Sequence, residues 1–179
     1  AILREMRSVI VAYSGGVDSV FLAVAAKEAL GPNALAVIAR SPSIAPSELR
    51  EALSLAESLK LNHSVIDTSE VERSDYQAND LNRCFFCKDE LYTHLTAMAT
   101  ERGYDWVANG TNVDDLGDYR PGLNAAEQYG VRMPLVEAEL SKAEIRALSK
   151  NMTLPTWDKP AQACLSSRIP YGTPVTVDA

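Results

Sequence analysis

The chain has 179 residues, of which 46% are hydrophobic and 23% charged, and this length suits one domain of ~100–200 residues. No segment approaches the ~18 consecutive apolar residues of a membrane span, and no basic and apolar leader opens the chain, so we expect a cytoplasmic protein without a membrane partner. The 17 Lys and Arg against 24 Asp and Glu give a net charge of −7, which disfavours a nucleic-acid partner because such binding depends on neutralising phosphates.

Short apolar runs alternate with helical patterns along the chain. These patterns predict strands over residues 8–13, 34–39, 62–67 and 105–108, and helices over 20–30, 47–59, 89–102 and 141–150. A further short strand is expected over 131–135. Ser47 is the expected N-cap of the second helix, and Ser141 with Glu144 matches a capping box in the last one. The order predicts an α/β fold, a mostly parallel sheet with helices on both faces and right-handed crossovers.

Long polar segments interrupt this pattern over residues 70–88, 110–130 and 154–173, and we expect them to be irregular. Loops this long are usually functional or disordered. Because ligands of open α/β sheets bind beyond the carboxyl ends of the strands, we expect these segments to surround that place. Residues 1–7 resemble the tail of a helix and 175–179 a strand cut off mid-run, so we expect the sequence to be a piece of a longer protein.

The string SGGVDS at residues 14–19 joins the first predicted strand to the first predicted helix. Gly15 and Gly16 allow a sharp turn whose N–H groups point inward, since no Cβ obstructs an approaching anion. Ser14 and Ser19 add hydroxyl donors, and the helix N-terminus adds partial positive charge. The turn therefore predicts a phosphate site, although it is neither a Walker loop nor the dinucleotide fingerprint. A tight turn without a ligand is the alternative.

The same string resembles the signature of the PP-loop ATP pyrophosphatases, and this resemblance implies that ATP gives up pyrophosphate while AMP passes to a substrate oxygen. Asp18 would then ligate Mg²⁺ on the phosphates, because magnesium prefers hard oxygen ligands. The backbone near Ala12 and the end of the second strand at residues 39–41 would frame the adenosine. Arg40 would contact a phosphate, or it is an ordinary surface arginine.

The chain holds three cysteines: Cys84 and Cys87 in a C-x-x-C, and Cys164 much later. All three fall in segments expected to be irregular and to lie at the ligand end of the sheet, so they can meet beside the nucleotide. Three thiolates would leave one iron of an iron–sulfur cluster open. A structural zinc site needs four ligands, with His63 or His94 completing the set. A redox-active C-x-x-C pair and three unrelated free thiols are also compatible with the sequence.

Four motifs together point to a family. They are SGGVDS at 14–19, NRCFFCK at 82–88, NGTNVDDLGDYRPG at 109–122 and LPTWDKPAQACLSSRIPYG at 154–172. In combination they resemble the LarE family, the sulfur transferases that mature the nickel-pincer cofactor of lactate racemase. The resemblance implies an adenine nucleotide alpha hydrolase-like fold. It also implies a PP-loop ATP pyrophosphatase domain over residues 1–179, with the start of a C-terminal sulfur-transfer region after about residue 155.

The resemblance also implies a reaction. A carboxylate of pyridinium-3,5-biscarboxylic acid mononucleotide would be adenylated, pyrophosphate released, and AMP replaced by sulfur to give a thiocarboxylate. Family members with three cysteines hold a 4Fe–4S cluster that carries an extra sulfide, whereas members with a single cysteine, at the position of Cys164, give up its sulfur. The three cysteines here resemble the cluster type, with sulfide or another sulfur donor as a partner. The alternatives are sacrifice of Cys164 and a cluster-dependent tRNA thiolase.

Further roles are implied only by analogy with the family. Gly110 and Thr111 would bind the nucleotide, and Arg168 would join the three cysteines at the catalytic site by pairing with the substrate's phosphate or carboxylates, because its planar fork suits both. An ordinary surface charge is the alternative for Arg168. Family members assemble as oligomers, which implies a homo-oligomer here. The remaining candidates are polar residues for metal or substrate, namely Lys88, Asp114, Asp115, Asp118 and Arg120.

Overall fold

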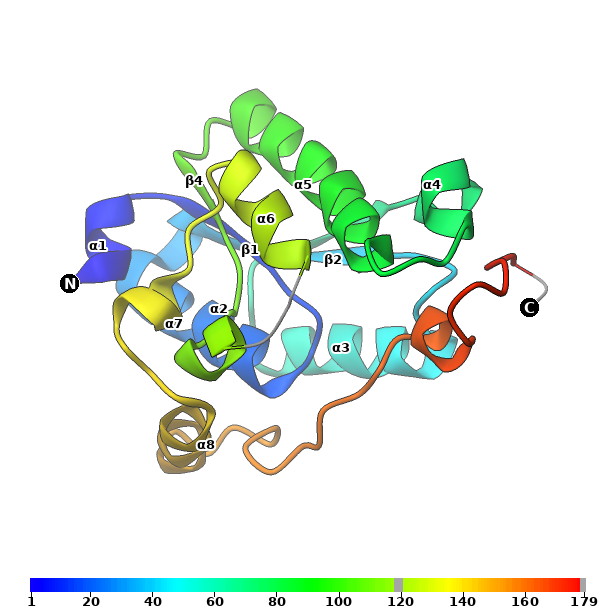
Figure 1. Ribbon diagram of the computed structural model, residues 1–179. Coiled ribbons are helices and arrows are strands. Elements are labelled where there is room, and N and C mark those ends of the chain that lie inside the picture. The colour runs from blue at the N-terminus through cyan, green and yellow to red at the C-terminus, as the bar shows by residue number, and fades with distance from the viewer. Residues whose placement is uncertain (118–120, 178–179) are drawn as a thin grey trace.

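The computed structural model describes residues 1–117 and 121–177, so the predicted candidates Asp118 and Arg120 lie outside the described residues. Four strands form one parallel sheet in the order β3-β2-β1-β4 (Figure 1). The strands are β1 (Val9–Ala12), β2 (Ala34–Arg40), β3 (His63–Asp67) and β4 (Trp106–Ala108). The predicted α/β class with a mostly parallel sheet is therefore confirmed.

Helices cover both faces of the sheet, as predicted (Figure 1). The α-helices are α1 (Ile2–Met6), α2 (Val17–Leu30), α3 (Pro46–Ser58), α4 (Ser74–Gln77), α5 (Arg83–Arg102), α6 (Pro121–Gln128), α7 (Pro134–Glu137) and α8 (Lys142–Asn151). Single 3₁₀ turns are η1 (Gly31–Asn33), η2 (Glu70–Glu72), η3 (Val113–Gly117) and η4 (Leu165–Arg168). Helices α2, α3 and α8 pack on one face, and α5 with α6 packs on the other.

The central strand β1 divides two apolar cores. Val9 and Val11 belong to the core shared with α2 and α3, whereas Ile10 belongs to the core that holds Tyr92 and Leu95 of α5. Successive side chains of a strand point to opposite faces, so a strand covered on both sides needs a continuous apolar run. This is why residues 8–13 contain no charged side chain.

Two predicted strands are not found among the described residues. Over 131–135 the chain makes only a single bridge, Ala108 to Arg132, and then enters α7 at Pro134. Proline fits the first turn of a helix, where its missing N–H is not needed, and this ends the extended run. The described part of the run 175–179 also forms no strand.

Helices differ from the prediction at several places: α2 begins at Val17, three residues early, and α4 and α6 lie within the segments 70–88 and 110–130 that were expected to be irregular. Helix α5 begins at Arg83, so Cys84 and Cys87 lie in its first turns and not in an irregular segment. Helix α3 begins at Pro46 with Ala45 as its N-cap, so Ser47 is not the cap. The ring of proline fixes φ near the helical value, so proline is favoured at the first position of a helix, and α3 includes Pro46 as well as Ser47. The capping box of α8 at Ser141 and Glu144 is confirmed by both reciprocal hydrogen bonds.

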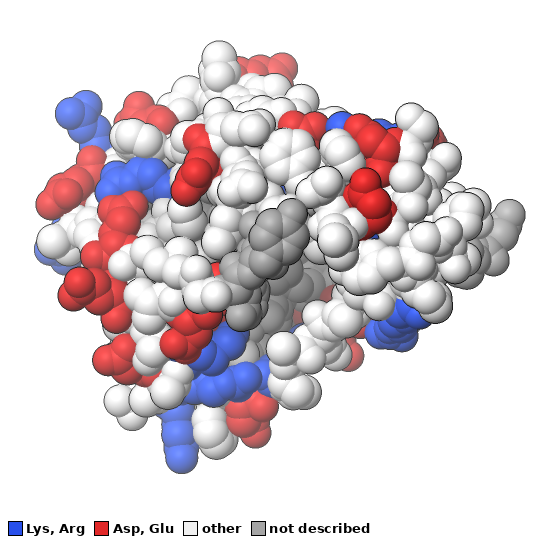
Figure 2. All heavy atoms as spheres, viewed as in Figure 1, with Lys and Arg blue, Asp and Glu red and all other residues white. Residues whose placement is uncertain are grey.

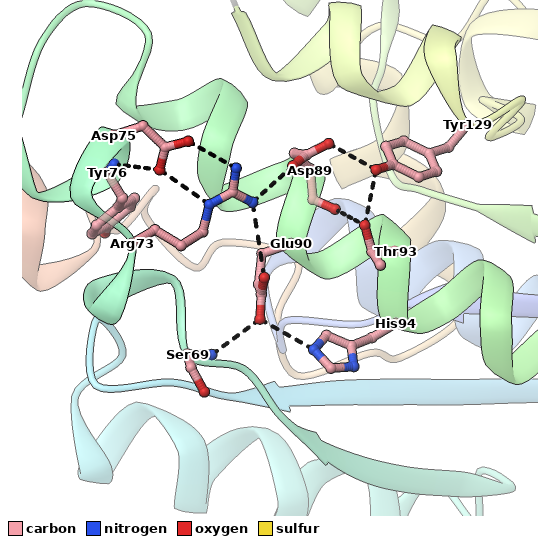
Figure 3. A network of polar contacts seen from close by, with 9 residues as sticks. All are labelled: Ser69, Arg73, Asp75, Tyr76, Asp89, Glu90, Thr93, His94 and Tyr129. Atoms are coloured by element: carbon pink, nitrogen blue, oxygen red, sulfur yellow. Dashed lines mark hydrogen bonds and ion pairs between the residues drawn. The ribbon is translucent and has the colours of Figure 1, made fainter.

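A polar network fastens the start of α5 to its neighbours (Figure 3). Arg73 donates to Asp75 on α4 and to Asp89 on α5, at 2.9 and 2.7 Å. These hydrogen bonds raise the pKa of Arg73 and hold the pKa of each aspartate below its usual value. Tyr129, which follows α6, donates to Asp89 at 2.7 Å, while Glu90 accepts from the backbone of Ser69. The network fixes the turn of α5 that directly follows the C-x-x-C.

The surface carries charges of both signs. On the face drawn in Figure 2, acidic and basic side chains are intermingled, and the described residues form no continuous basic surface there. Within the described ranges, no helix has both the length and the apolar character that crossing a membrane requires.

Candidate nucleotide and thiol site

The turn at residues 14–19 depends on glycine for its shape. Gly15 has a φ of +80°, a left-handed conformation that L side chains rarely adopt. A Cβ added at Gly15 would also stand 2.8 Å from the Cβ of Ala52 on α3. The turn is therefore pressed against α3, and glycine is required there for both its backbone conformation and its lack of a side chain.

The two serines of the turn brace its backbone. The backbone N–H of Ser14 donates to Oγ of Ser19 at 3.1 Å, and the two hydroxyls are 3.1 Å apart. The hydroxyl of Ser19 also reaches the carbonyl of Gly16, the N-cap of α2, at 3.3 Å. Ala12, at the end of β1, leads directly into this turn. The structure thus brings a helix N-terminus, two hydroxyls and a glycine backbone together, as a phosphate site requires.

Asp18 lies in the first turn of α2 and is mostly buried. Its Oδ2 accepts a hydrogen bond from Nζ of Lys142, the first residue of α8. Its Oδ1 is buried and finds no hydrogen-bond partner among the described residues. A carboxylate oxygen without a partner, beside a phosphate site, fits the hard oxygen ligand that Mg²⁺ prefers. Lys142 was not predicted, because nothing in the local sequence near residue 142 points to Asp18.

Gly110 approaches the start of α2 closely. A Cβ added at Gly110 would stand 3.0 Å from the backbone nitrogen of Ser19 and 3.1 Å from the carbonyl carbon of Asp18. Gly110 is predicted to bind the nucleotide, and the structure shows that it packs against the glycine turn. The next residue, Thr111, donates its N–H to the side chain of Asn109 at 3.0 Å, which holds the loop after β4 in place.

We expect Gly110→Ala to destabilise the fold by about 1–3 kcal/mol, because a methyl group would crowd the backbone of Asp18 and Ser19 and the turn would have to shift. The same change should weaken ATP binding by displacing the turn. Urea unfolding and calorimetric titration with ATP measure the two effects. Gly117→Ala is the matched control, since a Cβ there meets no described atom within 4 Å. An unchanged urea midpoint for Gly110→Ala would contradict this account of the packing.

Other predicted polar residues have structural partners. Arg40, at the end of β2, makes a two-pronged ion pair with Asp67 at the end of β3, with N–O distances of 2.5 and 2.8 Å. Asp114 accepts from the backbone N–H of Lys142 at 2.8 Å, and Asp115 from the backbone of Asn112 at 3.1 Å. The two aspartates thus hold the loop after β4 and the start of α8 together.

The segment after α8 runs past the glycine turn toward the end of β2, and it passes below α3 in Figure 1. Lys159 lies over the turn, with Nζ 3.4 Å from the carbonyl of Gly15. Farther along, the N–H of Leu165 donates to the carbonyl of Ser43 at 2.9 Å. The five residues from Lys159 to Cys164 can span at most about 18 Å, because an extended chain covers ~3.3–3.6 Å per residue. The backbone of Cys164 is therefore held within about 18 Å of the backbone of Lys159, whose side chain contacts the turn.

Three buried hydroxyls join this segment to the domain. The phenol of Tyr76 is 2.8 Å from Oγ of Ser43 and donates to Oγ of Ser166 at 2.8 Å, and Ser166 contacts Ser43 at 3.2 Å. Burial raises the pKa of Tyr76, which keeps its hydroxyl protonated. Each hydroxyl is satisfied by the other two, as buried polar groups require. None of these residues was predicted, because they meet only in the folded chain.

The three cysteines are free thiols, with Cys84 exposed and both Cys87 and Cys164 partly exposed. Removal of the thiolate from water raises the pKa of Cys87 to about 11, and negative charge on Cys164 and Cys84 contributes to the same shift. The same groups affect the pKa of Lys88. Desolvation lowers this pKa, but the negative charges of Tyr92 and the three cysteines raise it, and the net shift is upward. Packing relates the two parts of the chain as well: Cys87 and Ile169, which lies five residues after Cys164, pack against the same small apolar cluster.

The positions of the cysteines and histidines bear on the choice between a zinc site and an iron–sulfur cluster. Among residues 1–117 and 121–177, no three His, Cys, Asp or Glu side chains are placed to hold one metal ion. His63 instead contacts the carbonyl of Leu61, and His94 pairs with Glu90. The described chain thus offers no four-ligand set for the zinc alternative. An iron–sulfur cluster requires a wider spacing of ligands, because its thiolates bind separate iron atoms and stand farther apart than the ligands of one ion.

Arg168, predicted to pair with the substrate, lies in η4 with its side chain 61% exposed. Its Nη2 is 3.8 Å from a carboxylate oxygen of Glu48 at the start of α3. A loose and exposed pair of this kind contributes little to stability. The guanidinium therefore remains available to an anion at the end of the sheet that holds the thiols.

The chain matches the family model described as NAD synthase over residues 3–94, which is 92 of its 179 residues. It is similar to an uncharacterized protein of Synechocystis sp., with 48% identity over 174 residues, 97% of this chain and 65% of that protein. It is also similar to pyridinium-3,5-bisthiocarboxylic acid mononucleotide synthase of Lactiplantibacillus plantarum, with 36% identity over 179 residues, 99% of this chain and 65% of that enzyme. The chain thus spans 65% of the length of these relatives.

Among solved structures, the NMN synthetase of Francisella tularensis has a similar fold, with a TM-score of 0.69. The likeness covers 90% of this chain and 69% of that one, at 22% sequence identity. It supports the architecture of the sheet and its surrounding helices.

Proposed function

This chain belongs to the NAD synthase family, and from that premise we propose that it is an ATP-dependent enzyme that activates a carboxylate by adenylation and replaces AMP with sulfur. The sequence resemblance to the LarE family is confirmed by the 36% identity with a pyridinium-3,5-bisthiocarboxylic acid mononucleotide synthase. The substrate we propose is the corresponding pyridinium-3,5-biscarboxylic acid mononucleotide. One observation carries the proposal: the segment that follows α8 contacts the glycine turn through Lys159 and then brings Cys164 to Ser43, just after the carboxyl end of β2.

The first step uses the glycine turn. Backbone N–H groups at the start of α2, with the hydroxyls of Ser14 and Ser19, would hold the pyrophosphate of ATP. Asp18 would hold Mg²⁺ through its unpartnered oxygen, and Lys142 beside it would offset the charge that grows on departing pyrophosphate. The carboxylate oxygen of the substrate attacks the α-phosphorus, which forms the acyl-adenylate and breaks the bond to pyrophosphate. Adenylation turns a poor leaving group into a good one.

The second step uses the thiols. We propose that Cys84, Cys87 and Cys164 hold a 4Fe–4S cluster. Three thiolates leave one iron without a protein ligand, and the bound cluster would supply from there the sulfide that displaces AMP. The thiols lie at the ligand end of the sheet, and the segment that carries Cys164 passes over the glycine turn. Arg168 would pair with the phosphate or the free carboxylate of the substrate. Sacrifice of the Cys164 sulfur is the alternative source, and it needs only that one thiol.

The test is a two-part assay. The protein is incubated with ATP, Mg²⁺, sulfide and the biscarboxylic acid mononucleotide, after anaerobic reconstitution with iron and sulfide. We expect release of pyrophosphate that depends on the mononucleotide, and a product in which mass spectrometry finds oxygen replaced by sulfur. The same mixture without the mononucleotide is the control. A protein that binds ATP but releases no pyrophosphate would be a nucleotide-binding module and not this enzyme.

A further inference from the structure

Arg83 occupies an unusual position beside the thiols. It is the first residue of α5, directly before Cys84, and only 4% of it is exposed. Its acceptors among the described residues are all neutral: the side chain of Asn79, the carbonyl of Ser166 and the hydroxyl of Ser167. Its guanidinium also lies 5.6 Å from the ring centroid of Tyr171. A buried charge is costly unless it is well bonded, so these contacts point to a specific role.

The contacts of Arg83 join two distant segments of the chain. Nη1 donates to the backbone carbonyl of Ser166 at 2.8 Å, and Nη2 donates to Oγ of Ser167 at 3.1 Å. Asn79 strengthens the same junction, since its amide donates to the carbonyls of Pro170 and Thr173, both at 2.8 Å. The start of the helix that carries the C-x-x-C is thus held to the 3₁₀ turn that follows Cys164.

The contact extends to a sulfur atom. Oγ of Ser167 lies 3.0 Å from Sγ of Cys164. Because the guanidinium of Arg83 can only donate, Ser167 accepts from it with a lone pair and keeps its own proton free. That hydroxyl proton is then available to Cys164. Arg83 thus fixes the hydroxyl of Ser167, and the contact of this hydroxyl with the sulfur restrains the position of Cys164.

We propose that Arg83 is a positioning residue that sets the distance between the C-x-x-C and Cys164 and, through Ser167, directs the sulfur of Cys164 toward the other two thiols. The fixed charge of Arg83 also stands beside groups that are negative when they are ionised or bind iron. The value of this arrangement for sulfur transfer rests on the proposed function, whereas the arrangement itself does not need a cluster.

The test measures thiol proximity directly. The reduced protein without metal is treated with dibromobimane, which bridges two nearby thiols by alkylating each, and the bridged peptides are quantified by mass spectrometry. We expect wild type to bridge Cys164 to Cys84 or Cys87. Arg83→Lys keeps the charge but lacks the planar, two-pronged guanidinium. The yield of this bridged peptide should fall about tenfold, since hydrogen bonds to a charged group shift an equilibrium by about that factor or more. Circular dichroism verifies that the variant is folded.

Variants of Ser167 and an unrelated arginine complete the design. Ser167 is exposed. In Ser167→Ala the yield of the bridged peptide should fall about fivefold, as expected for the loss of one neutral hydrogen bond. Ser167→Thr should restore it, because threonine keeps the hydroxyl. Arg50→Lys, at an exposed position on α3, should bridge as wild type does. The Cys84–Cys87 bridge within α5 is the internal reference.

Two different results would overturn the proposal, and they can be told apart. If Arg83→Lys and Ser167→Ala both bridge Cys164 as efficiently as wild type, Arg83 does not position the thiols, and the proposed function is unaffected. If wild type itself bridges only Cys84 to Cys87, Cys164 does not gather with them, and both this inference and the three-cysteine cluster fail.

Discussion

Asp18→Ala should lower the rate of pyrophosphate release by at least about 10²-fold, the usual cost of removing one fixed electrostatic contact at a reacting group. Asp18 carries the buried oxygen without a partner, and its other oxygen binds Lys142. Alanine would remove the ligand proposed for Mg²⁺ and leave the ammonium of Lys142 without its anion. Asp18→Asn keeps the size but not the charge, so it should lose nearly as much. A continuous pyrophosphate assay at saturating ATP measures the rate.

A second aspartate serves as the control for charge removal. Asp105 is exposed at the amino end of β4, opposite the end that holds the glycine turn. Asp105→Ala should therefore release pyrophosphate as fast as wild type. Wild-type rates in Asp18→Ala would mean that the turn does not bind the phosphates through a metal at this carboxylate.

Each of Cys84→Ala, Cys87→Ala and Cys164→Ala should abolish the visible absorption of the anaerobically reconstituted protein, because a cluster that already lacks one protein ligand cannot lose another and remain bound. Sulfur transfer should fall to background in all three variants. Pyrophosphate release should continue, since the glycine turn contains no cysteine. Absorption spectra, iron and sulfide analysis, and the pyrophosphate assay measure these effects.

The two sets of variants control for one another. Asp18→Ala should keep the cluster and lose pyrophosphate release, whereas the cysteine variants should do the reverse. Sacrifice of Cys164 predicts another pattern: Cys84→Ala and Cys87→Ala would still form product, and mass spectrometry of the used protein would find sulfur missing at Cys164. That pattern would contradict the cluster.

The sequence predicted those parts of the molecule whose causes are local. The strands at 8–13 and 34–39 followed from apolar runs, and the capping box at Ser141 from two residues three positions apart. The sequence pattern predicts the start of α5 at residue 89 and not at Arg83, because the segment 70–88 is long and polar. What stabilises that first turn is Arg83, whose acceptors Ser166 and Ser167 come from a distant segment.

In the candidate site, too, the features set by neighbouring residues were predicted, and those set by tertiary contacts were not. The glycine turn was predicted in place because glycines, serines and the helix that follows are neighbours in sequence. Lys142 beside Asp18, and the contact of Tyr76 with Ser166, depend on tertiary packing between elements that no local pattern relates. The meeting of the cysteines was expected from topology, since loops at the carboxyl ends of parallel strands share one side of a sheet. The hydrogen bonds of Arg83 with Ser166 and Ser167, which join the start of α5 to the segment after Cys164, were not predicted.

The hydrogen bond from Leu165 to Ser43 has a consequence for how the two steps are coordinated. Ser43 follows β2, the strand whose end was predicted to frame the adenosine, and Cys164 is the residue just before Leu165. In the proposed reaction, one strand end would therefore support both the activating half and the sulfur-donating half. A displacement at the end of β2 would then be passed through this hydrogen bond to the segment that carries Cys164.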